Sequence, residues 1–352
     1  MLLNLVGKST HNRLFLQLCL SLSERGWHYN FQVVLLHQIL RAVKVYQSLD
    51  EFSRLSKAIV TIGTFDGVHV GHQRILSRLK EISMKEQGET VVLTFFPHPR
   101  MVLQPDDIQL QLITTMQERE LLLGSAGIDH LIIQPFSKDF SRITAAEFIR
   151  DLLVKKIGLH TLVIGYDHHF GRNREGSFRE LEELAPIYGY TLEEIPGQVV
   201  NEVAVSSTKI RHALEQGDVH TANLLLGHDF TITGTVIEGD KIGRTIGFPT
   251  ANLAVAERYK LIPRDGIYAT MVQIESRFYK GMLYIGHRPV VNGTKRNIEV
   301  NIFDFDGDLY GQSISLQLKA YLREDKKIST LEELKVLLES DKQNATKILS
   351  CR

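Results

Sequence analysis

The sequence predicts two domains of different class, an α/β domain with a parallel sheet and then an antiparallel β-barrel that ends in a helix. Strand-like runs alternate with helical patterns up to about residue 227, and beyond it they follow one another across short turns. A chain of 352 residues is also too long for one ordinary compact core. We therefore predict domains over residues 43–227 and 228–352, preceded by an unassigned extension over 1–42.

Composition limits the classes of partner. The formal net charge is zero and the isoelectric point is about 7.3, which argues against a broad nucleic-acid or anionic-membrane surface. The most apolar early run, residues 14–22, is too short to span a bilayer. Cys19 and Cys351 are the only cysteines, which suits the reducing cytoplasm. No obligate protein partner is evident.

The extension over residues 1–42 has no clear hydrophobic period and no helix-capping pattern. It is either an artefact of a start codon placed upstream of the true one, near Val43, or a disordered or partner-binding leader. We expect a chain that begins at Lys44 to remain soluble and active.

The first domain is predicted from alternating strands and helices. Two helices begin with a capping box, at Thr115 with Glu118 and at Thr144 with Glu147. Ligands of parallel sheets bind beyond the carboxyl ends of the strands, so the loops at 63–72, 96–99 and 165–176 are candidate sites. The predicted strands are 58–62, 90–95, 129–134, 161–165 and 190–195.

Residues 63–72 form the most informative of these loops. Three glycines join a buried apolar strand to a helix, and free N–H groups at a helix start favour a phosphate. His69 and His72 lie three apart and are expected to point the same way. A tight turn with incidental histidines and a metal site are the alternatives, but no cysteine or His-Glu-x-x-His pattern is near. A nucleotide-phosphate site is favoured.

Other loops of this domain also carry candidate groups. Hydroxyls at the start of a helix near residue 206 are followed by Arg211, one turn in, which could pair with a phosphate. His98 lies between two prolines that restrict its backbone, although a rigid turn with an exposed histidine is an alternative.

The second domain is predicted from consecutive strands over 230–237, 266–274, 278–285, 297–305 and 313–321. Thr330 and Glu333 form a capping pair that begins a terminal helix, which is expected to close the barrel. Glu299 lies on one of the strands, and we expect it to face inward. A carboxylate there is costly unless it has a role.

The loop at 63–72 closely resembles the signature Gly-x-Phe-Asp-Gly-x-His-x-Gly-His of the bifunctional riboflavin kinase/FMN adenylyltransferase family. The resemblance, which covers residues 44–350, implies a Rossmann-like nucleotidylyltransferase domain in which His69 and His72 are catalytic. It implies ATP contacts from Gly63, Phe65, Asp66, Gly71, Ser206, Ser207, Thr208 and Arg211. It implies flavin contacts from His98, Asp167, Phe170 and Gly171. His168 departs from this family, which has phenylalanine there.

The barrel resembles the riboflavin kinase part of the same family, through the Pro-Thr-Ala-Asn motif at 249–252 and the stretch at 298–311. The resemblance implies that Glu299 is the catalytic base and that Thr250 and Asn252 help to hold Mg²⁺. It implies nucleotide and phosphate contacts from Gly239, Gly243, Arg244, Gly247 and Pro249. Val290 stands where the family has threonine. Riboflavin, FMN and ATP are the implied substrates.

Two other functions compete with this one. The chain could be an adenylyltransferase whose barrel only binds flavin, for which Val290 is the motive, or a flavin-binding protein without catalysis. The presence of Glu299, His69 and His72 argues against both, because binding alone needs none of these side chains.

Overall fold

The structure is a computed structural model and describes residues 43–104, 110–165, 176–195, 205–239, 242–290, 293–326 and 330–350. The side chains of residues 242, 288–290 and 293–295 are outside this description. So are the extension 1–42 and the loop 166–175, which contains Asp167, His168, Phe170 and Gly171. Within the described part of the chain, no helix has the length and apolar character needed to cross a membrane.

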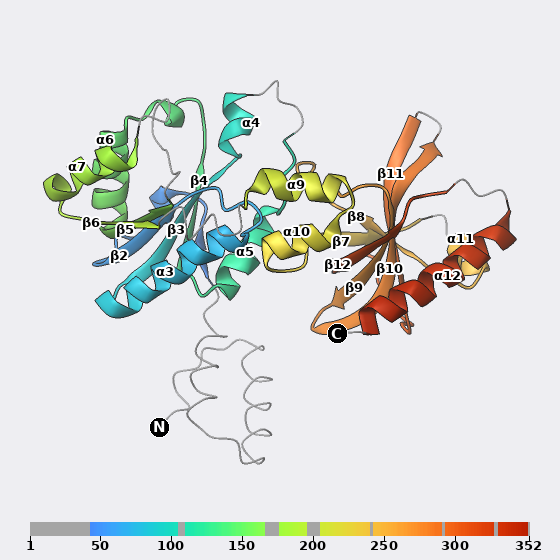
Figure 1. Cartoon of the computed structure of the whole chain (residues 1–352). Coiled ribbons are helices and arrows are strands. Elements are labelled where there is room, and N and C mark those ends of the chain that lie inside the picture. The colour runs from blue at the N-terminus through green and yellow to red at the C-terminus, as the bar shows by residue number, and fades with distance from the viewer. Residues whose placement is uncertain are drawn as a thin grey trace, which may run out of the picture. The chain divides into compact units, whose positions relative to one another are not determined.

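A six-stranded parallel sheet forms the first half of the described chain, in the order β1-β4-β3-β2-β5-β6 (Figure 1). This confirms the predicted fold class. The five predicted strands are present within two residues of their predicted ends, and β1 was missed. The strands are β1 (Lys44–Tyr46), β2 (Ala58–Ile62), β3 (Glu89–Phe96), β4 (His130–Pro135), β5 (Leu159–Gly165) and β6 (Thr191–Ile195).

Helices cover both faces of this sheet. Successive residues of β2 are buried on opposite faces: Ile59 packs in a cluster with α3 and α5, whereas Val60 packs with η3 and α7. Both predicted capping boxes are present, at Thr115 and Thr144. The helical segments are η1 (Leu49–Glu51), α3 (Val70–Glu86), α4 (Pro99–Leu103), α5 (Met116–Ser125), η2 (Phe140–Arg142), α6 (Ala145–Glu147), η3 (Phe148–Ile157) and α7 (Phe178–Tyr188).

The strand order places the loop after β2 at a topological switch point. From β2 the chain adds β3 and then β4 on one side, and β5 then pairs with β2 on the other side. The connections that follow β2 and β5 therefore diverge, which is where open parallel sheets bind their ligands. The candidate loop at 63–72 begins at this point.

Two helices lead into the barrel, α9 (Ser207–Glu215) and α10 (Val219–Leu226). As predicted, the strands that follow form a closed antiparallel barrel, in the order β10-β11-β8-β7-β12-β9. They are β7 (Thr231–Ile237), β8 (Ala251–Ala254), β9 (Gly266–Ile274), β10 (Arg277–Val290), β11 (Gly293–Ile302) and β12 (Ser313–Arg323), with α11 (Ile242–Thr245) before β8.

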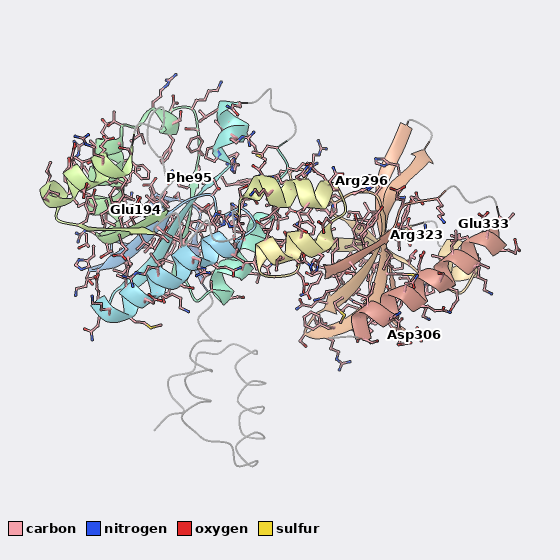
Figure 2. The ribbon with its side chains drawn as sticks, in the orientation of Figure 1. Phe95, Glu194, Arg296, Asp306, Arg323 and Glu333 are labelled. Carbon is pink, nitrogen blue, oxygen red and sulfur yellow. The ribbon has the colours of Figure 1, made fainter. Side chains whose placement is uncertain are left out.

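The terminal helix α12 (Leu331–Ser350) covers part of the outer face of the barrel, and Ala345 and Leu349 pack against Ala269 and Met282 there. The predicted cap is present, because Glu333 N–H donates to Thr330 Oγ1. Arg323 at the end of β12, labelled in Figure 2, donates two hydrogen bonds to buried Asp341 of α12, at 2.9 and 2.7 Å. Such a two-point ion pair fixes the helix on the barrel.

Candidate functional site

The loop between β2 and α3 has an unusual backbone. Phe65, Gly67 and Val68 have φ values of 48°, 82° and 40°. This left-handed region is uncommon for residues with side chains, and for β-branched valine it is strained. Replacement of Gly67 by a larger residue is disfavoured, since a Cβ there would lie 3.1 Å from the Ile113 side chain and 3.2 Å from that of Leu226. The packing around the loop therefore holds it in a conformation that an isolated segment would avoid.

His69 and His72 lie together at the start of α3, as their spacing predicts. Their rings stack with centroids 3.6 Å apart and planes at 14°, and the ring of Phe65 lies 4.9 Å from that of His72. His69 is the N-cap, and its Nδ1 accepts the His72 N–H at 3.3 Å. That bond places the proton of a neutral His69 ring on Nε2. Gly71 is buried in the same first turn.

Both the environment and the neighbours of His72 disfavour a charged ring. Burial, with His69 and Arg119 nearby, holds the pKa of His72 well below its ordinary value of 6.5. Its buried Nδ1 has no hydrogen-bond partner within the described residues. An unpartnered buried nitrogen is costly, and a bound ligand or water would remove that cost. The ring is therefore a neutral donor or acceptor near pH 7.

Asp66 organises the surroundings of this pair. Its side chain is 1% exposed and lies between Arg119 Nη2 at 3.3 Å and Arg211 Nη2 at 2.6 Å. Its carboxylate also accepts the N–H groups of Ile113 and Thr114, both at 3.1 Å. One carboxylate beside two guanidinium groups leaves the cluster with a net positive charge, which suits an anionic ligand.

Helix α9 supplies the hydroxyls and Arg211. Ser206 is its N-cap and accepts the Lys209 N–H at 3.3 Å, whereas Ser207 Oγ donates to the backbone oxygen of Asp66 at 3.1 Å. Thr208 is exposed. Arg211 also donates to Gln111 O at 2.7 Å. The structure thus brings α9 against the loop that follows β2, although the two are more than a hundred residues apart in the chain.

His98 joins this neighbourhood from the end of β3. It is the N-cap of α4, and its Nδ1 accepts the Arg100 N–H at 3.2 Å. Burial lowers the pKa of His98 to about 4, against the opposing effect of Asp66, and Arg119 and Arg211 lower it further. The other predicted flavin contacts, Asp167, Phe170 and Gly171, lie outside the described residues.

The low pKa of His98 predicts that this side chain contributes to the loss of protein stability in acid. Because its folded-state pKa of about 4 lies below the ordinary 6.5, the unfolded chain binds more protons between these values, and stability falls as the pH falls through that window. In His98→Asn, which keeps an N-cap side chain, the free energy of unfolding should fall less from pH 7 to pH 5. The ceiling of this difference is about 1.4 kcal/mol per pH unit below 6.5. Urea unfolding at both pH values measures it.

The matched control is His212→Asn, because His212 is exposed on α9. It should lose stability between pH 7 and pH 5 as the unmodified protein does. Equal losses in all three proteins would show that folding does not lower the pKa of His98.

The second candidate site lies around Glu299 on β11. The expectation that Glu299 faces the inside of the barrel is wrong. Ile298, Val300 and Ile302 belong to the apolar cluster inside the barrel. Side chains alternate along a strand, so Glu299 and Asn301 face outward. Glu299 is nevertheless only 6% exposed. The apolar residues of β11 occupy the interior, and the carboxylate lies where the segment before β8 covers the outer face.

Several predicted residues gather around this carboxylate. Thr250 Oγ1 lies 3.4 Å from Glu299 Oε2, and Asn252 pairs with Glu299 in the β8–β11 register. Asn301 Nδ2 donates to Pro249 O at 2.6 Å, which ties the segment to β11. A Cβ on Gly239 would lie 2.1 Å from Asn252 Nδ2, so any larger residue at position 239 would displace the Asn252 side chain.

The remaining residues of the predicted kinase site lie in the turn before β8. A Cβ on Gly243 would lie 2.2 Å from Phe248 O, and Gly247 has a φ of 88°. Arg244 and Pro249 are exposed. The side chain of Val290 is outside the described part of the chain, so the structure gives no account of this departure from the family motif.

Sequence reasoning missed two residues of these sites. Asn301 could have been found from strand alternation, because it shares a face with Glu299 two positions away. Arg119 carries no comparable signal: it is a charged residue in a helix, and only the tertiary structure buries it beside Asp66.

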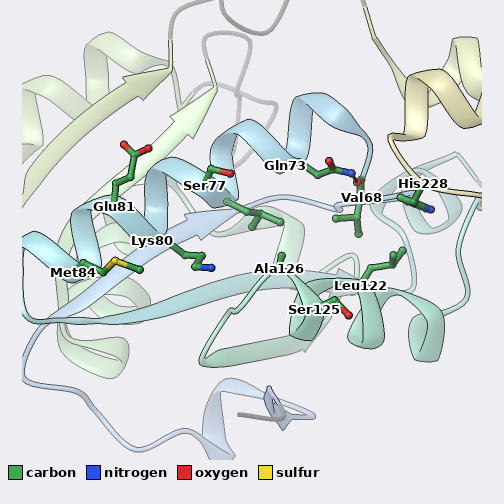
Figure 3. Close-up of a pocket in the computed structure, with 11 residues that line it drawn as sticks. Val68, Gln73, Ser77, Lys80, Glu81, Met84, Leu122, Ser125, Ala126 and His228 are labelled. Carbon is green, nitrogen blue, oxygen red and sulfur yellow. Dashed lines mark hydrogen bonds between the residues drawn. The ribbon is translucent and has the colours of Figure 1, made fainter. Parts of the chain in front are cut away.

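A cavity of about 480 Å³ lies along α3 and α5, as Figure 3 shows. Gln73, Lys80 and Glu81 of α3 line one side of it and Leu122 and Ser125 of α5 line the other. Neither His69 nor His72 lines this cavity, so it is separate from the histidine pair.

Comparisons with known proteins match both halves of the chain. The family model for FAD synthetase matches residues 51–209, and that for riboflavin kinase matches residues 226–349. The bifunctional riboflavin kinase/FMN adenylyltransferase of Escherichia coli (strain K12) is 36% identical over 288 residues, which is 82% of this chain and 91% of that protein. The protein of the same name from Bacillus subtilis (strain 168) is 35% identical over 301 residues, 84% of this chain and 93% of that protein.

A solved structure has the same fold. The crystal structure titled macrolide-efflux protein from Streptococcus pneumoniae superposes with a TM-score of 0.78 at 30% identity, and the match covers 86% of this chain and 98% of that one. The match therefore spans both the parallel sheet and the barrel.

Proposed function

Because the chain belongs to the bifunctional riboflavin kinase/FMN adenylyltransferase family, we propose that its two reactions occur at the two sites described above, one in each half. The enzyme phosphorylates riboflavin with ATP to give FMN, and adenylylates FMN with a second ATP to give FAD and pyrophosphate. The main support for assigning adenylyl transfer to the first half is the stacked His69–His72 pair. This pair lies at the switch point of a parallel sheet, next to a cluster of net positive charge.

In the adenylyl transfer site, an oxygen of the FMN phosphate attacks the α-phosphorus of ATP. The new P–O bond forms as the bond to the leaving pyrophosphate breaks, and no protein nucleophile is needed. We assign His69, His72 and Arg211 to the growing charge on the phosphates, with Ser207 and Thr208. The ATP contacts implied by the family motif are Gly63, Phe65, Asp66, Gly71 and Ser206, and the flavin contacts are His98, Asp167, Phe170 and Gly171.

The positions of these groups suggest different tasks. Asp66 is buried and holds Arg211, so it acts on ATP through the arginine. We assign to His69 and His72 hydrogen bonds to the phosphate oxygens, and the neutral ring of His72 adds no full charge. We assign the long-range attraction to the triphosphate to Arg211 and local hydrogen bonds to the imidazoles.

In the kinase site, Glu299 accepts the proton of the ribityl 5′-hydroxyl as that oxygen attacks the γ-phosphorus of ATP. The γ-phosphoryl group moves to riboflavin, and ADP leaves. Burial beneath the segment before β8 holds the carboxylate in one place, and phosphoryl transfer depends mainly on such positioning and on charge stabilisation. Gly239, Gly243, Arg244, Gly247 and Pro249 are assigned to the nucleotide and its phosphates.

The kinase site has a donor set that suits Mg²⁺. This ion takes oxygen ligands and uses few protein groups beside substrate phosphates. Thr250 supplies a hydroxyl and Asn252 an amide oxygen, and the Asn252 side chain lies against Gly239, where a Cβ would displace it. We assign Thr250 and Asn252 to the ion, which when bound neutralises phosphate charge. Glu299 lies beside both residues.

We also propose boundaries at 43–227 and 228–352 and a location in the cytoplasm. The two family matches, which end at 209 and begin at 226, support a boundary close to the end of α10 at Leu226. The presence of only two cysteines supports a reducing compartment.

Removal of metal tests the kinase assignment directly. Purified protein incubated with riboflavin, ATP and Mg²⁺ should yield FMN and then FAD on chromatographic separation of the flavins. An excess of chelator should abolish FMN formation, and added Mg²⁺ should restore it. Asn252→Ala should raise the Mg²⁺ concentration needed for half-maximal kinase activity, whereas Asn223→Ala on α10 should not. Full kinase activity of the Asn252 variant at unchanged Mg²⁺ dependence would contradict the proposed site.

A further inference from the structure

Lys260 is a buried cation that neither proposed reaction uses. Its side chain is 1% exposed, and its ammonium group lies 4.5 Å from the centroid of the Phe230 ring. Burial lowers the pKa of Lys260, and the nearby Glu118 carboxylate opposes that effect. A buried charge of this kind is retained only with good partners.

The ammonium group has three acceptors. Nζ donates to Glu118 Oε2 at 2.6 Å, to Ile113 O at 2.7 Å and to Thr231 O at 2.6 Å. An ammonium group has three N–H donors, and these bonds use all of them. Glu118 and Ile113 belong to the adenylyl transfer half, and Thr231 begins the barrel. Lys260 therefore connects the two halves through one buried atom.

The backbone reinforces this connection. Leu112 N–H donates to Tyr259 O at 2.6 Å, and Leu261 N–H donates to Leu112 O at 2.8 Å. The other carboxylate oxygen of Glu118 accepts the Thr233 N–H of β7 at 3.1 Å. Residues 112–118 are thus fixed to the barrel half by main-chain and side-chain bonds together.

The same segment holds Asp66 on its other side. Ile113 accepts from Lys260 through its carbonyl and donates to Asp66 through its N–H. Thr114 N–H donates to Asp66 as well, and Thr114 Oγ1 accepts the Gly67 N–H at 3.1 Å. A shift of residues 112–114 would therefore move the carboxylate that holds Arg211 and the strained loop before His69.

We propose that Lys260, which is supplied by the kinase half, is a positioning residue for adenylyl transfer. It keeps residues 112–118 in place, and these residues keep Asp66, Arg211 and the loop at 63–72 in place. This inference rests on the proposed location of the adenylyl transfer site. Lys260 is not assigned a catalytic role, because its buried ammonium group donates to three protein acceptors and acts through Ile113 and Glu118.

The experiment compares three full-length variants. Lys260→Met removes the charge and keeps a long side chain. Glu118→Gln is milder, because glutamine also serves in a capping box. Arg323→Met is the control, because it breaks another ion pair, that with buried Asp341, and among the described residues neither partner is bonded to Asp66 or to residues 112–118.

Lys260→Met should lower kcat/KM for FMN adenylylation about tenfold or more, since small displacements of positioned groups cost large factors in rate. Riboflavin phosphorylation by the same protein sample should stay within about twofold, assayed well below the Tm of each variant. Glu118→Gln should show a smaller loss with the same selectivity, and it provides the test if Lys260→Met fails to fold. Arg323→Met should lower the Tm without a selective loss of adenylylation.

Equal losses of both activities in Lys260→Met and Glu118→Gln, or the same selective loss in Arg323→Met, would overturn the inference. Unchanged adenylylation in a folded Lys260→Met would do so as well. If instead the proposed location of the adenylyl transfer site is wrong, a His72→Ala variant will keep full adenylylation activity. This result is distinguishable from a failure of the inference about Lys260.

Discussion

Replacing His72 by alanine should lower kcat for FMN adenylylation by about 10²–10³, the usual cost of removing a donor aimed at developing charge. The KM for ATP should change little. In the proposed site, ATP in the ground state is expected to bind Arg211 and the N–H groups at the start of α3, whereas the neutral His72 ring adds little to long-range attraction. Steady-state kinetics with varied ATP and supplied FMN separate the two effects.

The same variant should phosphorylate riboflavin normally, because the proposed kinase site is a separate one, around Glu299 of the barrel. The control is His212→Ala, which removes an exposed imidazole from α9 and should retain both activities. A His72→Ala protein with normal kcat and only a raised KM for ATP would show that the ring serves binding alone. The role assigned to it in the transition state would then be wrong.

Replacing Glu299 by glutamine should abolish FMN formation from riboflavin while FAD formation from supplied FMN continues. Glutamine keeps the size of the side chain and an oxygen toward Thr250, but it cannot take the hydroxyl proton. Loss of a general base typically costs 10²–10⁴ in rate, so we expect a fall of about that size in kcat. Separating the flavins after incubation with each substrate measures both reactions on one sample.

The control for this variant is Glu332→Gln, which changes an exposed carboxylate in the first turn of α12. It should leave both activities near normal. If a folded Glu299→Gln protein lost both activities, the assignment of one reaction to each half would fail. If it retained riboflavin phosphorylation, Glu299 would not be the base.

The sequence predicted the features that depend on local pattern. Alternating strands and helices identified the parallel sheet, and capping pairs such as Thr115 with Glu118 marked helix starts that the structure contains. The spacing of His69 and His72 predicted that they lie together, because residues three apart share a helix face. These predictions succeed because hydrogen bonds and side-chain direction within one element are set by neighbouring residues.

Strand β1 and the direction of Glu299 were not predicted correctly. A three-residue strand is too short to show a period, and β1 is defined only by its pairing with β4. Alternation showed that Glu299 and Val300 face opposite ways, but it left open which of them faces the barrel core. The closed barrel decided that question, because its interior is filled by apolar side chains and the carboxylate is excluded from it.

The charged cluster around His69 and His72 is the feature that the sequence alone predicted least, because its members come together only in the tertiary structure. Asp66 is bonded to Ile113 and Arg211, which lie 47 and 145 residues further along the chain. Lys260 reaches Glu118 across 142 residues. A sequence pattern could propose Asp66 and Arg211 as separate ligands of ATP. Their direct pairing, and the burial of Arg119 and Lys260 beside them, follow from the fold, because only buried charges brought together in space offset one another's loss of water.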